Sequence, residues 1–178
     1  MNRSLSALAL AAALCSGGAA HASLITFDNP GVIAIDNNTG IATYSEAGYV
    51  ITGPATSFLP LDSAMVGGFD ATAFTLSQMG GGSFTLQSLD LAAFDLGFGP
   101  GTLLVLGLVG GTQVASRSFD LANTGSVLFD GAWANLTSIS FSASGGFALD
   151  NISTVPEPGG FMLAGAGLLL LAAARKRR

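Results

Sequence analysis

The sequence predicts an all-β fold, a β-sandwich of the jelly-roll kind, flanked by an apolar segment at each end of the chain. Three observations carry this prediction. Between residues 23 and 155, no window of about 11 to 18 residues repeats its apolar positions as an amphipathic helix would. Glycine and proline interrupt this stretch every few residues, and the segments between them are rich in Phe, Leu, Val, Ile, Thr and Ser, which is typical of short strands. A body of this size can bury a core without disulfides.

Each expected strand is a short apolar run between turn residues. We expect strands over residues 24–28, 48–52, 73–77, 83–86, 89–94, 102–109, 112–119, 126–129, 136–142 and 146–152. The alternation of apolar and polar residues slips by one position between Leu86 and Leu89, which predicts a bulge or a strand break at Gln87–Ser88. Glycines supply the positive φ angles that hairpin turns need, so we expect one hairpin at Gly110-Gly111 and a second at Ser144-Gly145 or Gly145-Gly146.

The amino-terminal segment has the three parts of a secretory signal peptide. Arg3 supplies a positive charge, residues 5–14 form an apolar run, and Ala20 and Ala22 form a small-x-small cleavage site. We therefore expect residues 1–22 to engage the secretion translocon and to be removed by signal peptidase after Ala22. The alternative, a membrane-retained helix, fits less well because the apolar run is too short to span a bilayer.

This cleavage would remove most of the reactive side chains. Cys15 and His21 are the only cysteine and the only histidine, and both precede the cleavage site. The mature chain then has no thiol and no imidazole, which excludes Ser-His-Asp and Cys-His catalysis, zinc sites built on these residues, and disulfides. Nucleic acid is excluded as a partner, because the body from 23 to 155 has ten acidic residues and Arg117 as its only basic one.

The carboxyl-terminal segment also has three parts in a fixed order. After the β domain, which we expect over residues 23–152, comes a linker over residues 153–160. We expect a transmembrane helix over residues 161–174 and a basic cytoplasmic tail over residues 175–178. Within the linker, Pro156 and Pro158 hold Glu157 in extended backbone, which suits presentation to a processing enzyme. The tail forms a membrane stop that leaves the body on the exported side of the membrane, and it consists of Arg175, Lys176, Arg177 and Arg178.

This tripartite tail resembles the PEP-CTERM sorting signal of exported proteins from Gram-negative, exopolysaccharide-producing bacteria. The resemblance rests on Pro156-Glu157-Pro158, on the apolar run from Phe161 to Ala174 and on the four basic residues that follow. It implies recognition by an exosortase, transient anchoring in the inner membrane, cleavage near the Pro-Glu-Pro, and delivery of the body to the cell surface or extracellular matrix. The alternative is a plain tail anchor that follows a proline-rich linker.

Three functions are open for the body. The first is that of a non-enzymatic surface or matrix protein, associated with exopolysaccharide or biofilm and without a cofactor. The second is a carbohydrate-binding module for matrix polysaccharide. Trp133 is the best candidate for its sugar contact, and the alternative for this side chain is a loop tryptophan folded onto the core. The third is a matrix glycoside hydrolase, which needs two carboxylates about 5 to 10 Å apart, and no such pair stands out in the sequence.

Calcium is the one ligand that the acidic residues suggest, because it prefers oxygen ligands. Asp28 and Asp150, each followed by an asparagine, lie at the ends of the first and last expected strands. In a jelly roll these two strands are commonly neighbours, which would bring the two aspartates together. The alternative is that each aspartate caps a turn, as aspartate often does after a strand.

Overall fold

The computed structural model describes residues 21–28, 33–61, 63–70, 72–94, 97, 101–123 and 125–157. The chain divides into two units, of which Ala22–Pro156 is the compact unit described below. The expected transmembrane helix, the basic tail and all but the last two residues of the expected signal peptide lie outside the described residues. In the described part of the chain, no helix is long and apolar enough to cross a membrane.

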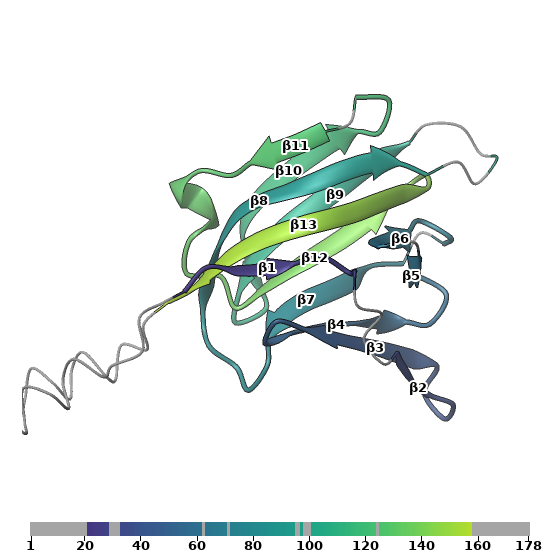
Figure 1. The fold of residues 1–178 in the computed structure, drawn as a ribbon, viewed down its shortest axis with the longest axis horizontal. Coiled ribbons are helices and arrows are strands. Elements are labelled where there is room, and N and C mark those ends of the chain that lie inside the picture. Colours follow the sequence, from purple (N-terminus) through teal and green to yellow (C-terminus); the bar gives the residue numbers. More distant parts are fainter. Residues whose placement is uncertain are drawn as a thin grey trace, which may run out of the picture. The chain divides into compact units, whose positions relative to one another are not determined.

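The described residues of this unit form an all-β fold with two antiparallel sheets (Figure 1). The strands are β1 (Ser23–Ile25), β2 (Ala34–Asp36), β3 (Ile41–Glu46), β4 (Tyr49–Pro54), β5 (Phe58–Leu61), β6 (Ala64–Gly67), β7 (Phe74–Gln78), β8 (Phe84–Ala93), β9 (Thr102–Val109), β10 (Thr112–Asp120), β11 (Gly125–Leu128), β12 (Ser138–Ala143) and β13 (Phe147–Pro156). A short 3₁₀ helix, η1 (Gly131–Trp133), precedes β12. The expectation of an all-β body is confirmed.

The two sheets differ in size and in strand order. The six-stranded sheet has the order β11-β8-β13-β6-β5, with β1 also paired to β13. The seven-stranded sheet has the order β10-β9-β12-β7-β4-β3-β2. The last strand, β13, therefore lies inside its sheet, with β8 along one side and with β6 and then β1 along the other.

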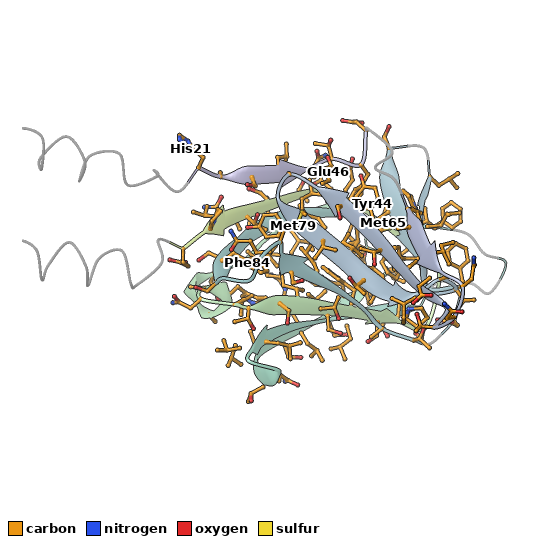
Figure 2. All side chains as sticks on the ribbon, turned by 90° about the horizontal axis from the view of Figure 1, so that it is seen from below. His21, Tyr44, Glu46, Met65, Met79 and Phe84 are labelled. Atoms are coloured by element: carbon orange, nitrogen blue, oxygen red, sulfur yellow. The ribbon has the colours of Figure 1, made fainter. Side chains whose placement is uncertain are left out.

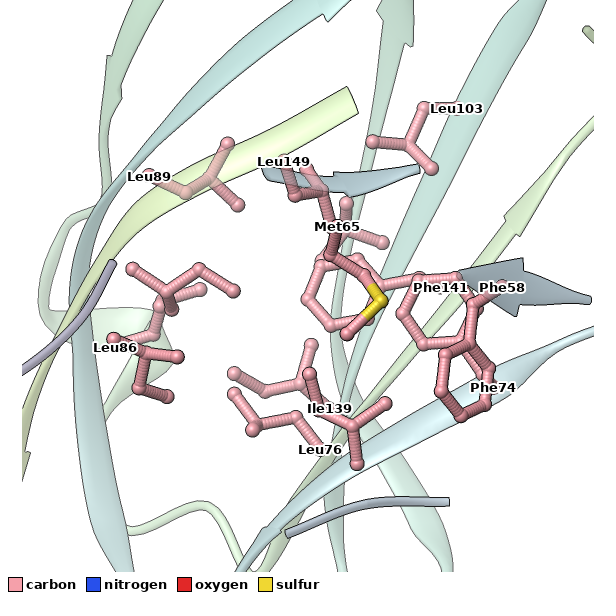
Figure 3. Packing of buried hydrophobic residues seen from close by; sticks show 14 of the residues in the cluster. Phe58, Met65, Phe74, Leu76, Leu86, Leu89, Leu103, Ile139, Phe141 and Leu149 are labelled. Carbon is pink, nitrogen blue, oxygen red and sulfur yellow. The ribbon is translucent and has the colours of Figure 1, made fainter. Parts of the chain in front are cut away.

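Apolar side chains from both sheets meet in one core (Figure 3). Along β12 every second residue is buried, so Ile139 and Phe141 point inward. The ring of Phe74 in the seven-stranded sheet stacks on Phe141, 5.2 Å between centroids, and on Phe147 of the six-stranded sheet at 5.9 Å. Phe74 thus links the two sheets at the centre of the core, as expected for a β-sandwich.

The irregularity expected at Gln87–Ser88 is present as a bulge rather than a strand break. β8 runs unbroken through both residues, and its register against β13 shifts so that Gln87 has no partner between Ser88 and Leu86. Leu86 and Leu89 are both fully buried. The extra residue therefore brings both leucines to the inner face.

One of the two expected hairpins is confirmed. Gly110 and Gly111 have φ angles of 56° and 82° and connect the paired strands β9 and β10. The hairpin expected at 144–146 is wrong, because β12 belongs to the seven-stranded sheet and β13 to the other. The glycines there carry the chain across the sandwich, an outcome that turn composition alone does not distinguish from a hairpin.

The β domain extends further than the sequence indicated. β13 continues to Pro156, and Val155 and Pro156 are paired with Thr85 and Phe84 of β8. Residues 153–156, expected in the linker, therefore belong to the last strand. The sequence signal was weak here, because Thr154 is a polar residue that is fully buried.

Candidate functional site

The start of β1 and the end of β13 lie side by side, as the jelly-roll expectation required (Figure 1). Ser23, the expected first residue of the mature chain, is opposite Thr154, and Ile25 is opposite Ile152. The Thr154 hydroxyl also donates to the Ser23 carbonyl oxygen at 3.5 Å. The expected points of signal-peptide removal and of tail processing are thus brought to one end of one strand pair.

The candidate sorting residues lie where this strand pair ends. Pro156 is the last residue of β13, and Glu157 follows it. Ala22, which precedes β1, is exposed. Pro158, Ala20 and the basic residues 175–178 lie outside the described residues, so their assigned roles stay predictions.

A group of carboxylates lies beside the same two strands. Asp150 of β13 is directly opposite Asp90 of β8. Burial raises the pKa of the Asp150 carboxyl above its usual value, and the Asn151 N–H opposes this rise. The negative charges of Asp28, Asp90 and Glu46 raise the same pKa further, which shows that these groups are close enough to repel.

Asn151 stabilises the pair of opposite aspartates. Its side-chain amide donates to Asp90 Oδ2 at 2.8 Å and to Asp150 Oδ2 at 3.2 Å, while its backbone N–H donates to Asp150 Oδ1 at 2.7 Å. Hydrogen bonds from the Ser126 hydroxyl and from Asn151 lower the pKa of Asp90. The two carboxylates therefore have pKa values shifted in opposite directions by their surroundings.

Glu46 accepts hydrogen bonds from the segment that follows β1. Its carboxylate accepts the N–H groups of Thr26 and Phe27, both at 3.1 Å, and the Tyr44 hydroxyl at 2.7 Å. Figure 2 shows Tyr44 and Glu46 on the same strand. The sequence offered only one signal for this role, namely that Glu46 is the only glutamate between residues 23 and 155.

The structure agrees only in part with the arrangement of Asp28 and Asp150 that a calcium site requires. The structure brings Asp28 close enough to Asp150 for their charges to interact. Among the described residues, no group of three or more His, Cys, Asp or Glu side chains is arranged to hold a metal ion. Calcium binding by Asp28 and Asp150 thus stays a prediction.

Trp133 is not an exposed platform. It ends η1, whose first turn is capped by Asp130 accepting the Ala132 N–H, and its side chain is only 5% exposed. Its ring packs edge-on against Phe129, 4.7 Å between centroids. The expectation of a surface sugar contact at Trp133 is corrected accordingly: the indole packs into the core, which is the alternative that the sequence left open.

The outer surface of the seven-stranded sheet carries an uncharged group of hydroxyls and leucines. Serines of β12 and β10 lie on either side of the outward leucines of β9, in rows such as Ser140–Leu106–Ser116. We call this group the serine–leucine face, and it consists of Ser116, Ser118, Ser138, Ser140, Ser142, Leu104, Leu106 and Leu108. Sequence reasoning missed it, because β12 lies next to β9 in the sheet although β10 and β11 separate the two strands in the sequence.

Comparison with known proteins bears on the tail rather than on the body. The fold and the junction at Pro156 define an all-β domain that is followed directly by a candidate processing signal. The PEP-CTERM protein-sorting motif matches residues 154–178. The chain thus carries a PEP-CTERM sorting motif at residues 154–178, and this motif, an exosortase recognition signal, implies export and membrane-associated sorting.

Two further comparisons extend beyond the tail. A comparison with curated proteins finds no match. A solved structure with some likeness is that of the Clostridium thermocellum N-terminal endo-1,4-β-D-xylanase 10B CBM22-1–GH10 modules complexed with xylohexaose. It is 12% identical, with a TM-score of 0.25, over 79% of this chain and 25% of that chain. The likeness is too weak to support any conclusion about this chain.

Proposed function

We propose that this protein is an exported, non-enzymatic component of the cell surface or extracellular matrix, associated with exopolysaccharide or biofilm. The observation that carries the proposal is the sorting motif over residues 154–178, which begins within the last strand of the folded body. The chain would be exported through the translocon, cut by signal peptidase after Ala22, held briefly in the inner membrane by residues 161–174 and processed by an exosortase. The body that it delivers is acidic.

The side-chain inventory supports a non-enzymatic body. After removal of residues 1–22 the chain has no cysteine and no histidine. A glycoside hydrolase would still be possible in principle with two carboxylates. The opposite pair Asp90 and Asp150 is a poor fit, because the Asn151 amide bonds to both carboxylates and occupies the space between them.

We also propose a jelly-roll-like topology for the sandwich. The first strand, β1, pairs with the last, β13. From β6 to β9 and from β10 to β13, each consecutive strand lies in the other sheet. This repeated crossing between two sheets is typical of a jelly roll.

Replacement of Glu157 tests the sorting proposal. In a producing strain that has an exosortase, we expect Glu157→Gln to remain at precursor size in the membrane fraction, while the wild-type protein is shortened and released. Asp36→Asn is the matched control, since it also removes one carboxylate, from the exposed end of β2 in the body. Normal size and location of the Glu157→Gln protein would overturn the proposal.

Carbohydrate binding is a second candidate function, and the serine–leucine face favours it. A pyranose ring has apolar C–H faces and hydroxyl edges, so a sugar chain lying along β9 would cover the leucines while its hydroxyls meet the serines. From Leu104 to Leu108 the strand spans about 13 Å, which is long enough for a short oligosaccharide. The face carries no charge, although the body is strongly acidic.

A matched pair of substitutions tests this second function. We expect the wild-type protein to be retained on exopolysaccharide from the producing strain, and Leu106→Ser to lose most of that retention because it interrupts the row of leucines. Leu128→Ser is the control, because Leu128 is 77% exposed on β11 of the other sheet. If exopolysaccharide retains Leu106→Ser and Leu128→Ser equally, or does not retain the wild-type protein, this face is excluded as a glycan site.

A further inference from the structure

The first residues of the sorting motif are held in the interior of a sheet. Thr154, Val155 and Pro156 are the last three residues of β13 and lie opposite Leu86, Thr85 and Phe84 of β8. Thr154 is also opposite Ser23 of β1, so it is enclosed by a strand on each side. Its side chain is fully buried.

A processing enzyme must bind the backbone around the bond that it cuts. Enzymes that take an extended peptide commonly do so by pairing with its main chain, which requires a free strand edge. Between residues 153 and 156 one edge of β13 is already paired with β8, and up to Thr154 the other edge is paired with β1. Cutting there would require local opening of the sheet.

The side chains of β1 make such opening unfavourable. Ile25 is 1% exposed and lies opposite the fully buried Ile152. The segment after β1 is fixed in turn to the other sheet by the Glu46 carboxylate. Detaching β1 from β13 would therefore expose apolar side chains and separate these hydrogen bonds.

We propose that the folded body sets the upstream limit of tail processing, so that the bond cut is Pro156–Glu157 or a later one, and that β1 protects the bonds before it. The inference rests on the proposed function in taking an exosortase as the enzyme. A side-chain nucleophile of that enzyme attacks the scissile carbonyl carbon, the C–N bond breaks, and the tail leaves as an amine that takes up a proton. Water or an amine then attacks the carbonyl carbon of the resulting acyl-enzyme, which frees the nucleophile of the enzyme and releases the body.

This limit keeps the product folded. Cleavage at or after Pro156 leaves every pair between β13 and β8 in place, whereas cleavage before Thr154 would remove three of those pairs and the partner of Ser23. The mature protein would then have its amino-terminal residue and its last strand residues side by side at one end of the sheet.

The mass of the mature protein tests the limit directly. The protein is purified from a producing strain with an exosortase, and its intact mass and terminal peptides are determined by mass spectrometry. We expect Ser23 at one end and a last residue at position 156 or later at the other. A last residue at 153, 154 or 155 would overturn the inference, while a chain that keeps its tail would overturn the proposed function.

Limited proteolysis tests the structural cause without an exosortase. The full chain is purified in detergent from a strain without an exosortase and treated with proteinase K. We expect first cuts beyond Pro156 and none between 153 and 156. Early cuts within 153–156 in the wild-type protein would show that β13 does not protect these bonds, and would overturn the inference even if the mass result agreed.

Two alanine variants on β1 make the test specific to that strand. Ile25→Ala removes a buried anchor, whereas Leu24→Ala trims a side chain that is 51% exposed on the same strand. We expect proteinase K to cut within 153–156 at least several-fold faster in Ile25→Ala and at the wild-type rate in Leu24→Ala. Equal rates in the two variants would exclude β1 as the protecting element.

Discussion

Glu46 joins the two sheets through the backbone of Phe27, whose N–H it accepts at 3.1 Å. Glu46 ends β3 of the seven-stranded sheet, and Phe27 follows β1 of the six-stranded sheet. Phe27 has a φ of 56°, in the left-handed region that non-glycine residues adopt at a cost, yet its side chain is only 2% exposed. The carboxylate therefore holds the start of the body in the conformation that buries this ring.

Replacing this carboxylate should destabilise the fold. We expect Glu46→Gln to lower the free energy of unfolding by about 1–3 kcal/mol, because an amide has one acceptor oxygen where two backbone N–H groups and two hydroxyls now bind. Urea unfolding of the purified body measures the change. Asp120→Asn, which alters a carboxylate at the exposed end of β10, should stay within about 0.5 kcal/mol of wild type. Equal effects of the two variants would contradict this role of Glu46.

Two buried tyrosines should respond in opposite ways to loss of the hydroxyl. The Tyr44 hydroxyl donates to Glu46 at 2.7 Å, so Tyr44→Phe should cost about 1.5–3 kcal/mol. The Tyr49 hydroxyl is buried and has no partner with hydrogen-bond geometry among the described residues. Burial raises its pKa, and the Thr154 hydroxyl nearby opposes this rise. Tyr49→Phe should leave stability unchanged or raise it by about 1 kcal/mol. Thermal unfolding of both variants measures the two changes in stability. A larger loss of stability in Tyr49→Phe than in Tyr44→Phe would contradict these roles of the two hydroxyls.

The opposite aspartates should give opposite pH dependences of stability. Burial and neighbouring charges raise the pKa of Asp150, so its ionised form disfavours the fold at neutral pH, and the fold gains stability as the pH falls through that pKa toward 3.8. Asp150→Asn should therefore raise the Tm at neutral pH, and the gain should shrink toward about pH 4.

Asp90 provides the matched comparison. Hydrogen bonds from Ser126 and Asn151 lower its pKa, so its ionised form favours the fold above its usual pKa of 3.8, and this contribution is lost as the pH falls further. Asp90→Asn should lower the Tm at neutral pH and have less effect in acid. The same sign for both variants at neutral pH would show that their environments do not differ as described.

Removal of metal ions tests whether Asp28 and Asp150 bind calcium or serve only as hydrogen-bond acceptors within the fold. The Asp150 carboxylate already accepts two hydrogen bonds from Asn151, at an irregularity inside β13 rather than at a turn, and these bonds use lone pairs that a calcium ion would need. We expect a chelator to leave the Tm of the full chain unchanged. A fall in Tm on chelation that calcium restores, and that is absent in Asp28→Asn, would instead establish a calcium site.

The parts of the fold that the sequence predicted are those set by local side-chain pattern. The shift in alternation between Leu86 and Leu89 located the bulge at Gln87, since both leucines must reach the core. β3 was missed because its only large inward side chain is Tyr44, so its alternation is weak. β5 was missed because it is short, lies at a sheet edge and contains Pro60, which usually argues against a strand.

The site depended on contacts that no local pattern encodes. The adjacency of Asp28 and Asp150 could be expected from the jelly-roll topology. The hydrogen bonds from Thr26 and Phe27 to Glu46 could not, because they cross between sheets and join residues about twenty positions apart. Trp133 was ambiguous for a similar reason, since only the packed Phe129 ring determines whether a loop indole turns inward.

Two glycines with similar backbone angles should differ in their tolerance of a methyl group. Gly48 and Gly68 have φ angles of 82° and 88°, so an alanine at either position is strained by about 1–2 kcal/mol. At Gly48 a Cβ atom meets nothing within 4 Å, whereas at Gly68 it would overlap the carbonyl oxygen of Gly145, between β12 and β13. Gly68→Ala should therefore destabilise by about 1–3 kcal/mol more than Gly48→Ala. Equal unfolding midpoints in urea would show that the chain between β12 and β13 moves away freely.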